Sequence, residues 1–199
     1  MSRTRVAILI SGGGSNMAAL LRDMADPSHP AAPCLVISNV AGAGGLARAA
    51  GARVPHACVE SAGFPDRPAF EAALDAALVA AGAEILCLAG FMRVLTPGFV
   101  ARWRGKALNI HPSILPLFPG LRTHARTLAA GMAVHGATVH EVTPTLDAGP
   151  ILGQGIVPVL PDDTVDSLAV RLLAMEHRLY PAVLRRFAVG DRAPVALFP

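Results

Sequence analysis

Short apolar runs alternate with helical patterns along the first 90 residues of the chain, and this alternation constrains the fold more than any other feature. The apolar runs predict strands, and the segments between them predict helices. Strands are expected at residues 6–10, 34–38, 53–59 and 85–89, and helices at residues 15–25, 46–50 and 69–81. Strands that alternate with helices form a mostly parallel sheet with helices on both faces. The sequence therefore predicts an α/β fold.

The pattern changes after residue 105, where the chain becomes less regular. One apolar strand runs into a loop with three prolines, which interrupt regular structure. Two later segments alternate apolar and polar side chains and predict neighbouring antiparallel strands that are half exposed. The expected elements are strands at 107–110, 134–142 and 151–159, helices at 121–130 and 164–187, and a turn-rich loop at 143–150. Antiparallel strands are therefore expected in the C-terminal half of the sheet, with a long C-terminal helix.

Composition and charge narrow the class of protein. The 17 basic residues are scattered and the net charge is +3, which is too little for a groove that binds nucleic acid. The three cysteines form no CxxC pair, so we expect no zinc site and reduced thiols in a cytoplasmic protein. Charged residues and glycines break the apolar stretch at 72–92, which argues against a membrane span, and no signal peptide follows Met1. Without a linker or repeat, residues 1–199 are expected to form one domain, as a monomer or a homodimer.

A glycine-rich loop, Ser-Gly-Gly-Gly-Ser-Asn at residues 11–16, joins the first expected strand to the first helix. Glycines let the backbone approach a ligand closely, and the helix that follows offers unpaired N–H groups to an anion. The loop lacks the third glycine of the dinucleotide fingerprint and the lysine of a P-loop. A single phosphate, as in a ribose 5-phosphate, therefore fits better than NAD or ATP. The alternative is a tight turn without a ligand, with Ser15 or Asn16 as the helix cap.

Asn109 and His111 lie two residues apart on one expected strand, so their side chains share a face. Pro112 ends that strand and places His111 at its carboxyl end, where open α/β sheets bind ligands. Asp147, in the loop at 143–150, supplies a carboxylate that favours and orients an imidazolium. The set has no nucleophilic serine or cysteine, so a substrate amine is expected to attack directly while Asn109 and His111 stabilise the oxyanion. Two alternatives stay open here, namely core residues bonded to neighbouring backbone and Asp147 as a turn former.

Four motifs occur in order along the chain. They are Ser-Gly-Gly-Gly-Ser-Asn at 11–16, Leu-Ala-Gly-Phe-Met-Arg at 88–93, Asn-Ile-His-Pro-Ser at 109–113 and Asp-Ala-Gly-Pro at 147–150. Together they closely resemble the phosphoribosylglycinamide formyltransferase family of the folate-dependent formyltransferase superfamily. The resemblance runs from Val6 to about Phe187. The Asn–x–His–Pro–Ser segment with the later aspartate marks the superfamily, and the Gly–Ser–Asn loop is the more specific marker.

The resemblance implies a three-layer Rossmann-like formyltransferase fold, with a phosphate-binding half at residues 1–100 and a catalytic and folate-loop half at 101–199. It implies formyl transfer from the co-substrate 10-formyltetrahydrofolate to the amine of 5-phosphoribosylglycinamide, in de novo purine biosynthesis and without a metal. Residues that match the catalytic set are Asn109, His111 and Asp147, with His111 as the proton donor. Residues that match the substrate-binding set are Gly14, Ser15, Asn16 and Glu176, and those that match the folate-binding set are Arg67, Met92, Arg93, Val94, Leu95 and Asn109. The chain departs from the family at Leu173, one turn before Glu176, where members can carry a polar residue that contacts the ribose.

Other functions fit the sequence less well. A methionyl-tRNA formyltransferase is expected to carry a further C-terminal domain that binds nucleic acid, and a formyltetrahydrofolate hydrolase an N-terminal regulatory domain. A sugar-nucleotide formyltransferase lacks the Gly–Ser–Asn loop. From a different class, the chain could be a non-catalytic module that binds a phosphometabolite. Spatial convergence of Asn109, His111 and Asp147 discriminates against that module, because binding alone has no need of all three.

Overall fold

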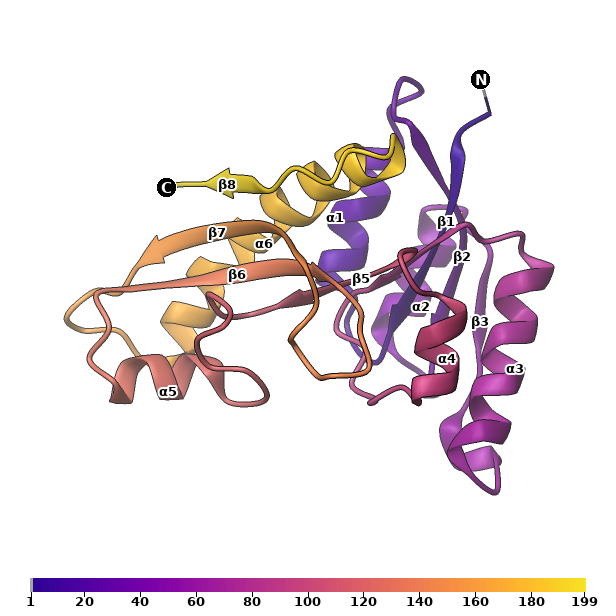
Figure 1. Ribbon diagram of the computed structural model, residues 1–199, viewed down its shortest axis with the longest axis horizontal. Helices are drawn as coiled ribbons and strands as arrows, with labels where there is room; N and C mark the ends of the chain where they lie inside the picture. Colours follow the sequence, from indigo (N-terminus) through magenta and orange to yellow (C-terminus); the bar gives the residue numbers. More distant parts are fainter. Residues whose placement is uncertain (1) are drawn as a thin grey trace.

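One eight-stranded sheet forms the centre of the computed structural model, which describes residues 2–199 (Figure 1). The strands lie in the order β3-β2-β1-β4-β5-β6-β7-β8. Both pairings of β6, with β5 and with β7, are antiparallel, and the other pairings are parallel. The strands are β1 (Thr4–Ile10), β2 (Ala31–Ser38), β3 (His56–Cys58), β4 (Ile85–Leu88), β5 (Ala107–His111), β6 (Val134–Glu141), β7 (Ile151–Pro158) and β8 (Val195–Leu197). The predicted mixture of a parallel first half and antiparallel strands in the C-terminal half is confirmed.

Helices cover both faces of this sheet, which gives the three layers that the sequence predicted (Figure 1). The helices are α1 (Ser15–Met24), α2 (Gly44–Gly51), α3 (Arg67–Ala80), α4 (Pro97–Arg102), α5 (Thr123–Ala129) and α6 (Val165–Ala188), with a short 3₁₀ turn at Ser61–Gly63. Side chains of α1, α2 and α6 share one apolar cluster with one face of the sheet. Side chains of α3 and α4 share a second cluster with the other face.

Strand β1 shows how the sequence builds both clusters. Val6 and Ile8 belong to the cluster with α1 and α6, whereas Ala7 and Leu9 belong to the cluster with α3 and α4. Because successive side chains of a strand point to opposite faces, a strand that is apolar at every position has to be covered on both sides. The continuous apolar run therefore determines the place of β1 in the middle of the sheet.

Short elements differ most from the prediction. Strand β3 is shorter than expected, and α4 and β8 were not predicted, because elements of three to six residues carry little periodicity. Strand β2 starts three residues earlier than expected, before Pro33. Strand β3 pairs only with Val36–Ser38, so β2 has no neighbour on that side at Pro33. The pairing of β2 with β1 is also irregular at this point. Both features allow a proline, which has no N–H to donate to a neighbouring strand.

The long helix α6 is tied to the strand ends that carry the candidate site. Tyr180, fully buried, places its hydroxyl 3.1 Å from the carbonyl oxygens of Leu88 and Leu108. These carbonyls belong to β4 and β5, so the helix supports the sheet where β4 ends. Among residues 2–199, no helix combines the length and apolarity needed to cross a membrane.

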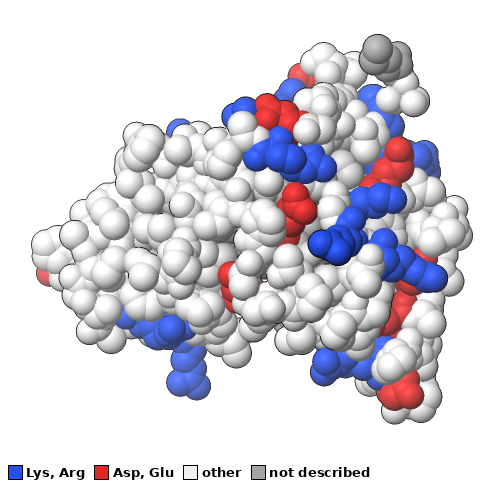
Figure 2. Space-filling view, viewed as in Figure 1, with Lys and Arg blue, Asp and Glu red and all other residues white. Residues whose placement is uncertain are grey.

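Charged side chains are unevenly distributed on the face drawn in Figure 2. Basic and acidic residues intermingle over the part that holds α3, α4 and the end of α6 (Figure 2). The lobe built from β6 and β7 shows few charges on this face (Figure 2).

Candidate active site

Strand β5 projects beyond the end of its neighbour β4. Asn109 pairs with Leu88, the last residue of β4, so His111 lies past the point where β4 stops. Leu108 and Ile110 point into the core on the other face of the strand. The strand thus presents Asn109 and His111 at the carboxyl edge of the sheet, where α/β proteins place their ligands.

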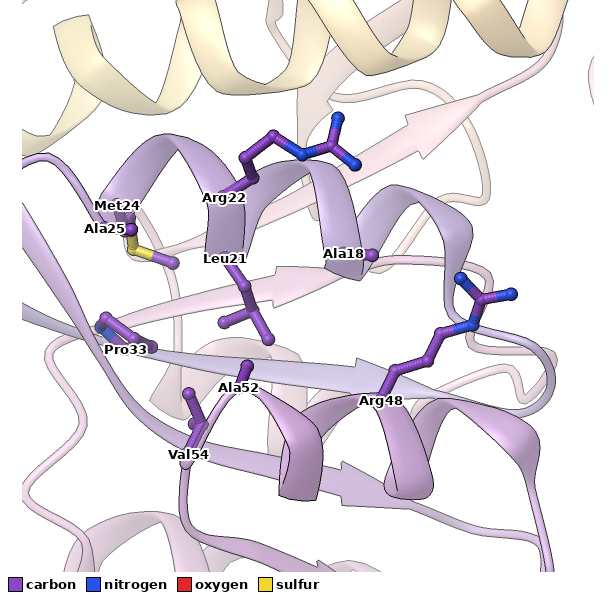
Figure 3. Close-up of a pocket in the computed structure, with 9 residues that line it drawn as sticks. All are labelled: Ala18, Leu21, Arg22, Met24, Ala25, Pro33, Arg48, Ala52 and Val54. Atoms are coloured by element: carbon purple, nitrogen blue, oxygen red, sulfur yellow. The ribbon is translucent and has the colours of Figure 1, made fainter.

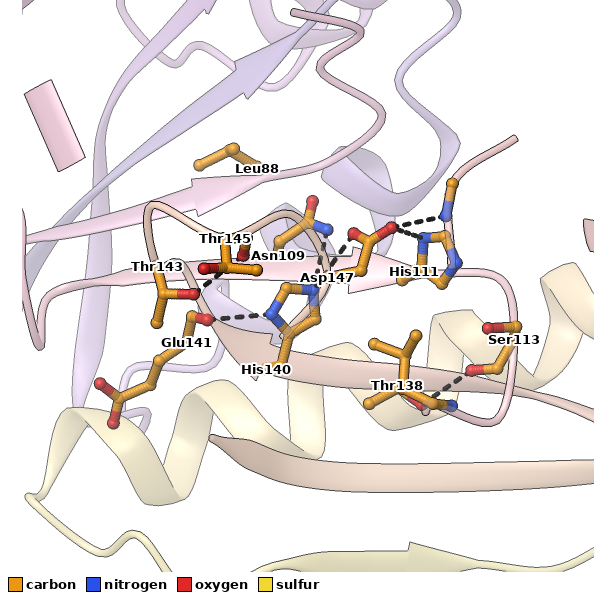
Figure 4. A network of polar contacts seen from close by, with 12 residues as sticks. Leu88, Asn109, His111, Ser113, Thr138, His140, Glu141, Thr143, Thr145 and Asp147 are labelled. Atoms are coloured by element: carbon orange, nitrogen blue, oxygen red, sulfur yellow. Dashed lines mark hydrogen bonds and ion pairs between the residues drawn. The ribbon is translucent and has the colours of Figure 1, made fainter. Parts of the chain in front are cut away.

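Asp147 reaches His111 from the loop between β6 and β7, and its second carboxylate oxygen lies 3.8 Å from Nε2 of His140 on β6 (Figure 4). Its carboxylate lies 3.4 Å from His111 Nδ1, and both side chains are largely buried. The same carboxylate accepts a hydrogen bond of 2.8 Å from the N–H of Gly120, in the loop that follows β5. Asp147 itself adopts the left-handed conformation, with φ of 53°. A strained backbone held by side-chain contacts is a common feature of functional loops.

Both nitrogens of His111 face acceptors. Nδ1 faces the Asp147 carboxylate, and Nε2 lies 3.1 Å from the carbonyl oxygen of Phe118. An imidazole that donates from both nitrogens is an imidazolium. Only a ring that carries a hydrogen on each nitrogen could donate to both of these acceptors at once.

His140 lies directly across from Asn109 on β6 (Figure 4). Its Nδ1–H donates to the carbonyl of Glu141 over 2.9 Å, which leaves Nε2 as an acceptor for the Asn109 amide at 3.2 Å. Burial lowers the pKa of His140, which favours the neutral ring. The contact orients the Asn109 side chain and leaves its second N–H hydrogen for a substrate. From the sequence, His140 is only a candidate to support the site, because it lies on the strand that leads into the Asp147 loop. Only the strand register shows that it lies opposite Asn109.

The glycine loop needs glycine for steric reasons at Gly14. Its φ is +69°, and an added Cβ would lie 3.0 Å from the Cα of Gly45 and from a methyl group of Met17. Gly14 is also the residue that caps α1, and no side chain caps this helix. The alternative in which Ser15 or Asn16 caps the helix is therefore wrong. The open N–H groups of the first turn remain available to an anion.

Asn16 and Glu176 meet although 160 positions separate them in the chain. The Asn16 amide donates to Glu176 over 2.6 Å, and both side chains are buried. Burial raises the pKa of Glu176. The partner of Glu176 is therefore a buried amide and not a basic side chain on the surface of the helix. Leu173 is partly buried on the same helix.

Most of the expected folate-binding residues, at 92–95, lie between β4 and α4, and Arg67 is the first residue of α3. Met92 and Val94 are exposed apolar side chains, and Arg67 is exposed at the start of α3. Arg93 lies over the ring of Phe70, 5.7 Å from its centre. Leu95 differs from the others, because it is buried in the core cluster. Its side chain packs into the core beneath the segment.

A groove elsewhere on the molecule holds none of the expected site residues. It has a volume of about 350 Å³ and lies between α1, α2 and β2 (Figure 3). Its walls are apolar apart from the exposed side chains of Arg22 and Arg48 (Figure 3). Among residues 2–199, no group of three or more His, Cys, Asp or Glu side chains is arranged to hold a metal ion.

A buried histidine anchors α5 beside the site. His135 Nε2 lies 3.0 Å from His124 Nδ1, and His135 Nδ1 lies 2.9 Å from the Thr127 hydroxyl. Burial, with smaller contributions from His124 and His111, lowers the pKa of His135 to about 4. The ring is therefore neutral at neutral pH.

We expect the protein to lose stability as the pH falls from 6.5 toward 4, because the unfolded chain binds a proton at His135 more readily than the folded chain does. The stabilisation that comes from the neutral His135 is complete above pH 6.5, the ordinary pKa of histidine. It declines as the pH falls from 6.5 to about 4. The free energy of unfolding is expected to fall by about 2 kcal/mol between neutral pH and pH ~5. Urea unfolding near pH ~7.5 and ~5 measures it, and His135→Gln should show a smaller loss between the two conditions. The same loss in both proteins would contradict the assignment.

Comparisons with known proteins fit this geometry. The family model described as "Formyl transferase" matches residues 4–184. The chain is 40% identical over 185 residues to phosphoribosylglycinamide formyltransferase of Escherichia coli (strain K12), covering 93% of this chain and 87% of the relative. It is 45% identical over 188 residues to the trifunctional purine biosynthetic protein adenosine-3 of Bos taurus, and that match covers 94% of this chain. The chain spans only 19% of the length of this trifunctional relative.

Solved structures agree with the sequence matches. The crystal structure of phosphoribosylglycinamide formyltransferase from Brucella melitensis superposes with a TM-score of 0.91 at 52% sequence identity. The match covers 95% of this chain and 97% of that one.

Proposed function

The chain belongs to the formyl transferase family and, within it, to the phosphoribosylglycinamide formyltransferases, and from this premise we propose how its own residues work. We propose that it transfers the formyl group of 10-formyltetrahydrofolate to the amine of 5-phosphoribosylglycinamide, a step of de novo purine biosynthesis. The observation that carries the proposal is the convergence of Asn109, His111 and Asp147 at the end of β5. The proposed compartment is the cytoplasm, which suits three cysteines without disulfides.

The first half of the chain, residues 1–100, is proposed to hold the phosphate of the ribonucleotide. Gly14, Ser15 and Asn16 form the start of α1, where backbone N–H groups and the helix dipole favour an anion. Glu176, held by Asn16, would accept a hydrogen bond from a ribose hydroxyl. The side chain of Leu173 cannot form a hydrogen bond. Of these two residues of α6, only Glu176 could therefore bind a ribose hydroxyl.

The folate is proposed to lie along residues 92–95, with Arg67 near its acidic end. The exposed side chains of Met92 and Val94 suit a flat apolar ring, and the two arginines suit a carboxylate. The 143–147 loop would close over the pterin, because it carries Asp147 to the same strand end. The folate supplies an activated formyl carbon, and no metal is proposed.

The second half of the chain, residues 101–199, is proposed to carry the proton transfers. As the substrate amine attacks the formyl carbon, Asn109 and His111 donate hydrogen bonds to the formyl oxygen, which gains negative charge. His111 then gives a proton to the nitrogen that leaves as its bond to the formyl carbon breaks. Asp147 keeps His111 protonated and receives the proton lost by the amine, directly or through water. Because Nδ1 faces Asp147, the donor to the substrate would be Nε2, and the substrate would replace the Phe118 carbonyl as its acceptor.

An assay with both substrates tests the proposal. Purified protein is mixed with 10-formyltetrahydrofolate and 5-phosphoribosylglycinamide, and loss of the formyl group from the folate is followed by absorbance. We expect turnover only when the ribonucleotide is present, because the proposed mechanism uses its amine as the nucleophile. The control omits the ribonucleotide.

The other outcomes point elsewhere. Loss of the formyl group without the ribonucleotide would indicate a hydrolase. No reaction in either mixture would contradict the proposal, and amines of sugar nucleotides would then be the next acceptors to assay.

A further inference from the structure

The segment that carries the proposed folate-binding residues has no regular structure of its own. Residues 92–95 belong to neither a helix nor a strand. At one end, the N–H of Met92 donates to the Ser11 hydroxyl over 2.8 Å, which ties the segment to the glycine loop. Because such a segment lacks a backbone ladder, contacts from neighbouring side chains determine its position.

Glu71 of α3 holds the other end of the segment. Its carboxylate accepts the N–H of Thr96 over 2.7 Å and also accepts the Thr96 hydroxyl. Glu71 is only 4% exposed, so these bonds are shielded from water. Hydrogen bonds to an ionised carboxylate are stronger than those between neutral groups. The carboxylate therefore fixes the residue that directly follows the folate-binding segment.

Helix α3 contacts the segment at a second point, one residue before Glu71. Phe70 is buried, and the guanidinium of Arg93 lies over its ring. Arg67, the remaining arginine proposed to contact the folate, is one turn earlier on the same helix. The first two turns of α3 thus carry Arg67, which is proposed to contact the folate. They also carry Phe70 and Glu71, which support the proposed folate-binding residues at 92–95.

Asp75 provides an internal comparison. It lies one turn after Glu71 on α3 and is also buried. Its carboxylate binds Arg102 and accepts the indole N–H of Trp103 over 3.0 Å, both at the far end of α4. The two acids therefore hold opposite ends of α4, and only Glu71 lies beside the folate-binding segment.

We propose that Glu71 is a positioning residue for the folate co-substrate, which it serves by holding Thr96 and thereby residues 92–95. The inference rests on the proposed function. Glu71 does not touch the reacting atoms, so its effect falls on folate affinity and not on the chemical step. The second carboxylate, Asp75, serves the stability of α4 without affecting either substrate.

Steady-state kinetics with each substrate varied in turn, together with calorimetric binding of tetrahydrofolate, test this. Glu71→Ala is expected to raise the KM for 10-formyltetrahydrofolate and the Kd for tetrahydrofolate about tenfold. The KM for the ribonucleotide and kcat should change less than about twofold, because the catalytic residues stay in place. Glu71→Gln, which keeps an acceptor of the same shape, should restore most of the affinity. Thr96→Val removes the hydroxyl, which also caps α4 by accepting the N–H of Phe99 over 3.3 Å. It should give an intermediate loss of folate affinity, and it serves if Glu71→Ala does not fold.

Asp75→Ala is the matched control, since it removes a buried acid from the same helix. It is expected to lower the melting temperature at least as much as Glu71→Ala and to leave both KM values unchanged. The inference would be overturned if the KM for the folate were unchanged in Glu71→Ala, or if it rose equally in Asp75→Ala. Turnover by the wild-type protein would in that case still support the proposed function. A wild-type protein that neither binds tetrahydrofolate nor turns over would instead overturn the proposed function itself.

Discussion

Replacing His111 with alanine is expected to lower kcat by at least about a hundredfold. The change removes the proposed proton donor and one of the two donors to the developing oxyanion. His111 contacts Asp147 and the carbonyl of Phe118 through its ring nitrogens, and the backbone pairing of β5 does not depend on the ring. The fold should therefore persist, with substrate binding less affected than kcat.

The measurement is the initial rate at saturating concentrations of both substrates, with circular dichroism as the check on folding. His56→Ala provides a matched control, because His56 is exposed and its Nδ1 contacts only a backbone carbonyl two residues away. This control should retain turnover within about twofold. Near-normal kcat in His111→Ala would remove His111 from the proposed mechanism.

Replacing Asp147 with asparagine is expected to lower kcat by a similar factor, at least about a hundredfold. Asparagine tolerates the left-handed backbone at this position, where φ is 53°. Its carbonyl oxygen can still accept the N–H of Gly120, so the loop should keep its place. What the variant loses is the negative charge 3.4 Å from His111, which favours the protonated ring.

A second substitution separates charge from loop position. Asp147→Ala also removes the contact with Gly120, so it should raise the KM for the folate in addition to lowering kcat. Asp191→Asn serves as the control, because this exposed carboxylate binds Arg186 far along the chain from the site. Equal kcat in wild type and Asp147→Asn would show that the charge has no part in the reaction.

The central sheet and one part of the site could be predicted from local sequence. The apolar run of β1 requires burial on both faces, and β1 is buried on both. The alternation in β6 and β7 correctly predicts two neighbouring strands, but the expected exposed face of β6 is wrong, because residues 135–140 are all buried. The spacing of Asn109 and His111 places them on the same face of any strand, and Pro112 ends that strand. The positions of these strands and the shared face of Asn109 and His111 could be predicted because the geometry of a strand repeats every two residues.

The contacts that complete the site could not be predicted from local patterns. His140 meets Asn109 across 31 positions of the chain, and Glu176 meets Asn16 across 160. Glu71 meets Thr96 across 25 positions, and nothing in its helix distinguishes it from Asp75. Each contact depends on strand register or on how helices pack, so single-sequence patterns leave the partners open.

The sequence by itself therefore determined the alternation of strands and helices, the glycine loop at the start of α1 and the shared face of Asn109 and His111, because each follows from the geometry of neighbouring residues. Only the tertiary structure decided that Asp147 reaches His111, that His140 orients Asn109 and that Glu176 is buried against Asn16. The reason is physical. Local geometry repeats every two to four residues, whereas these contacts form only when the whole sheet and its two helix layers have packed.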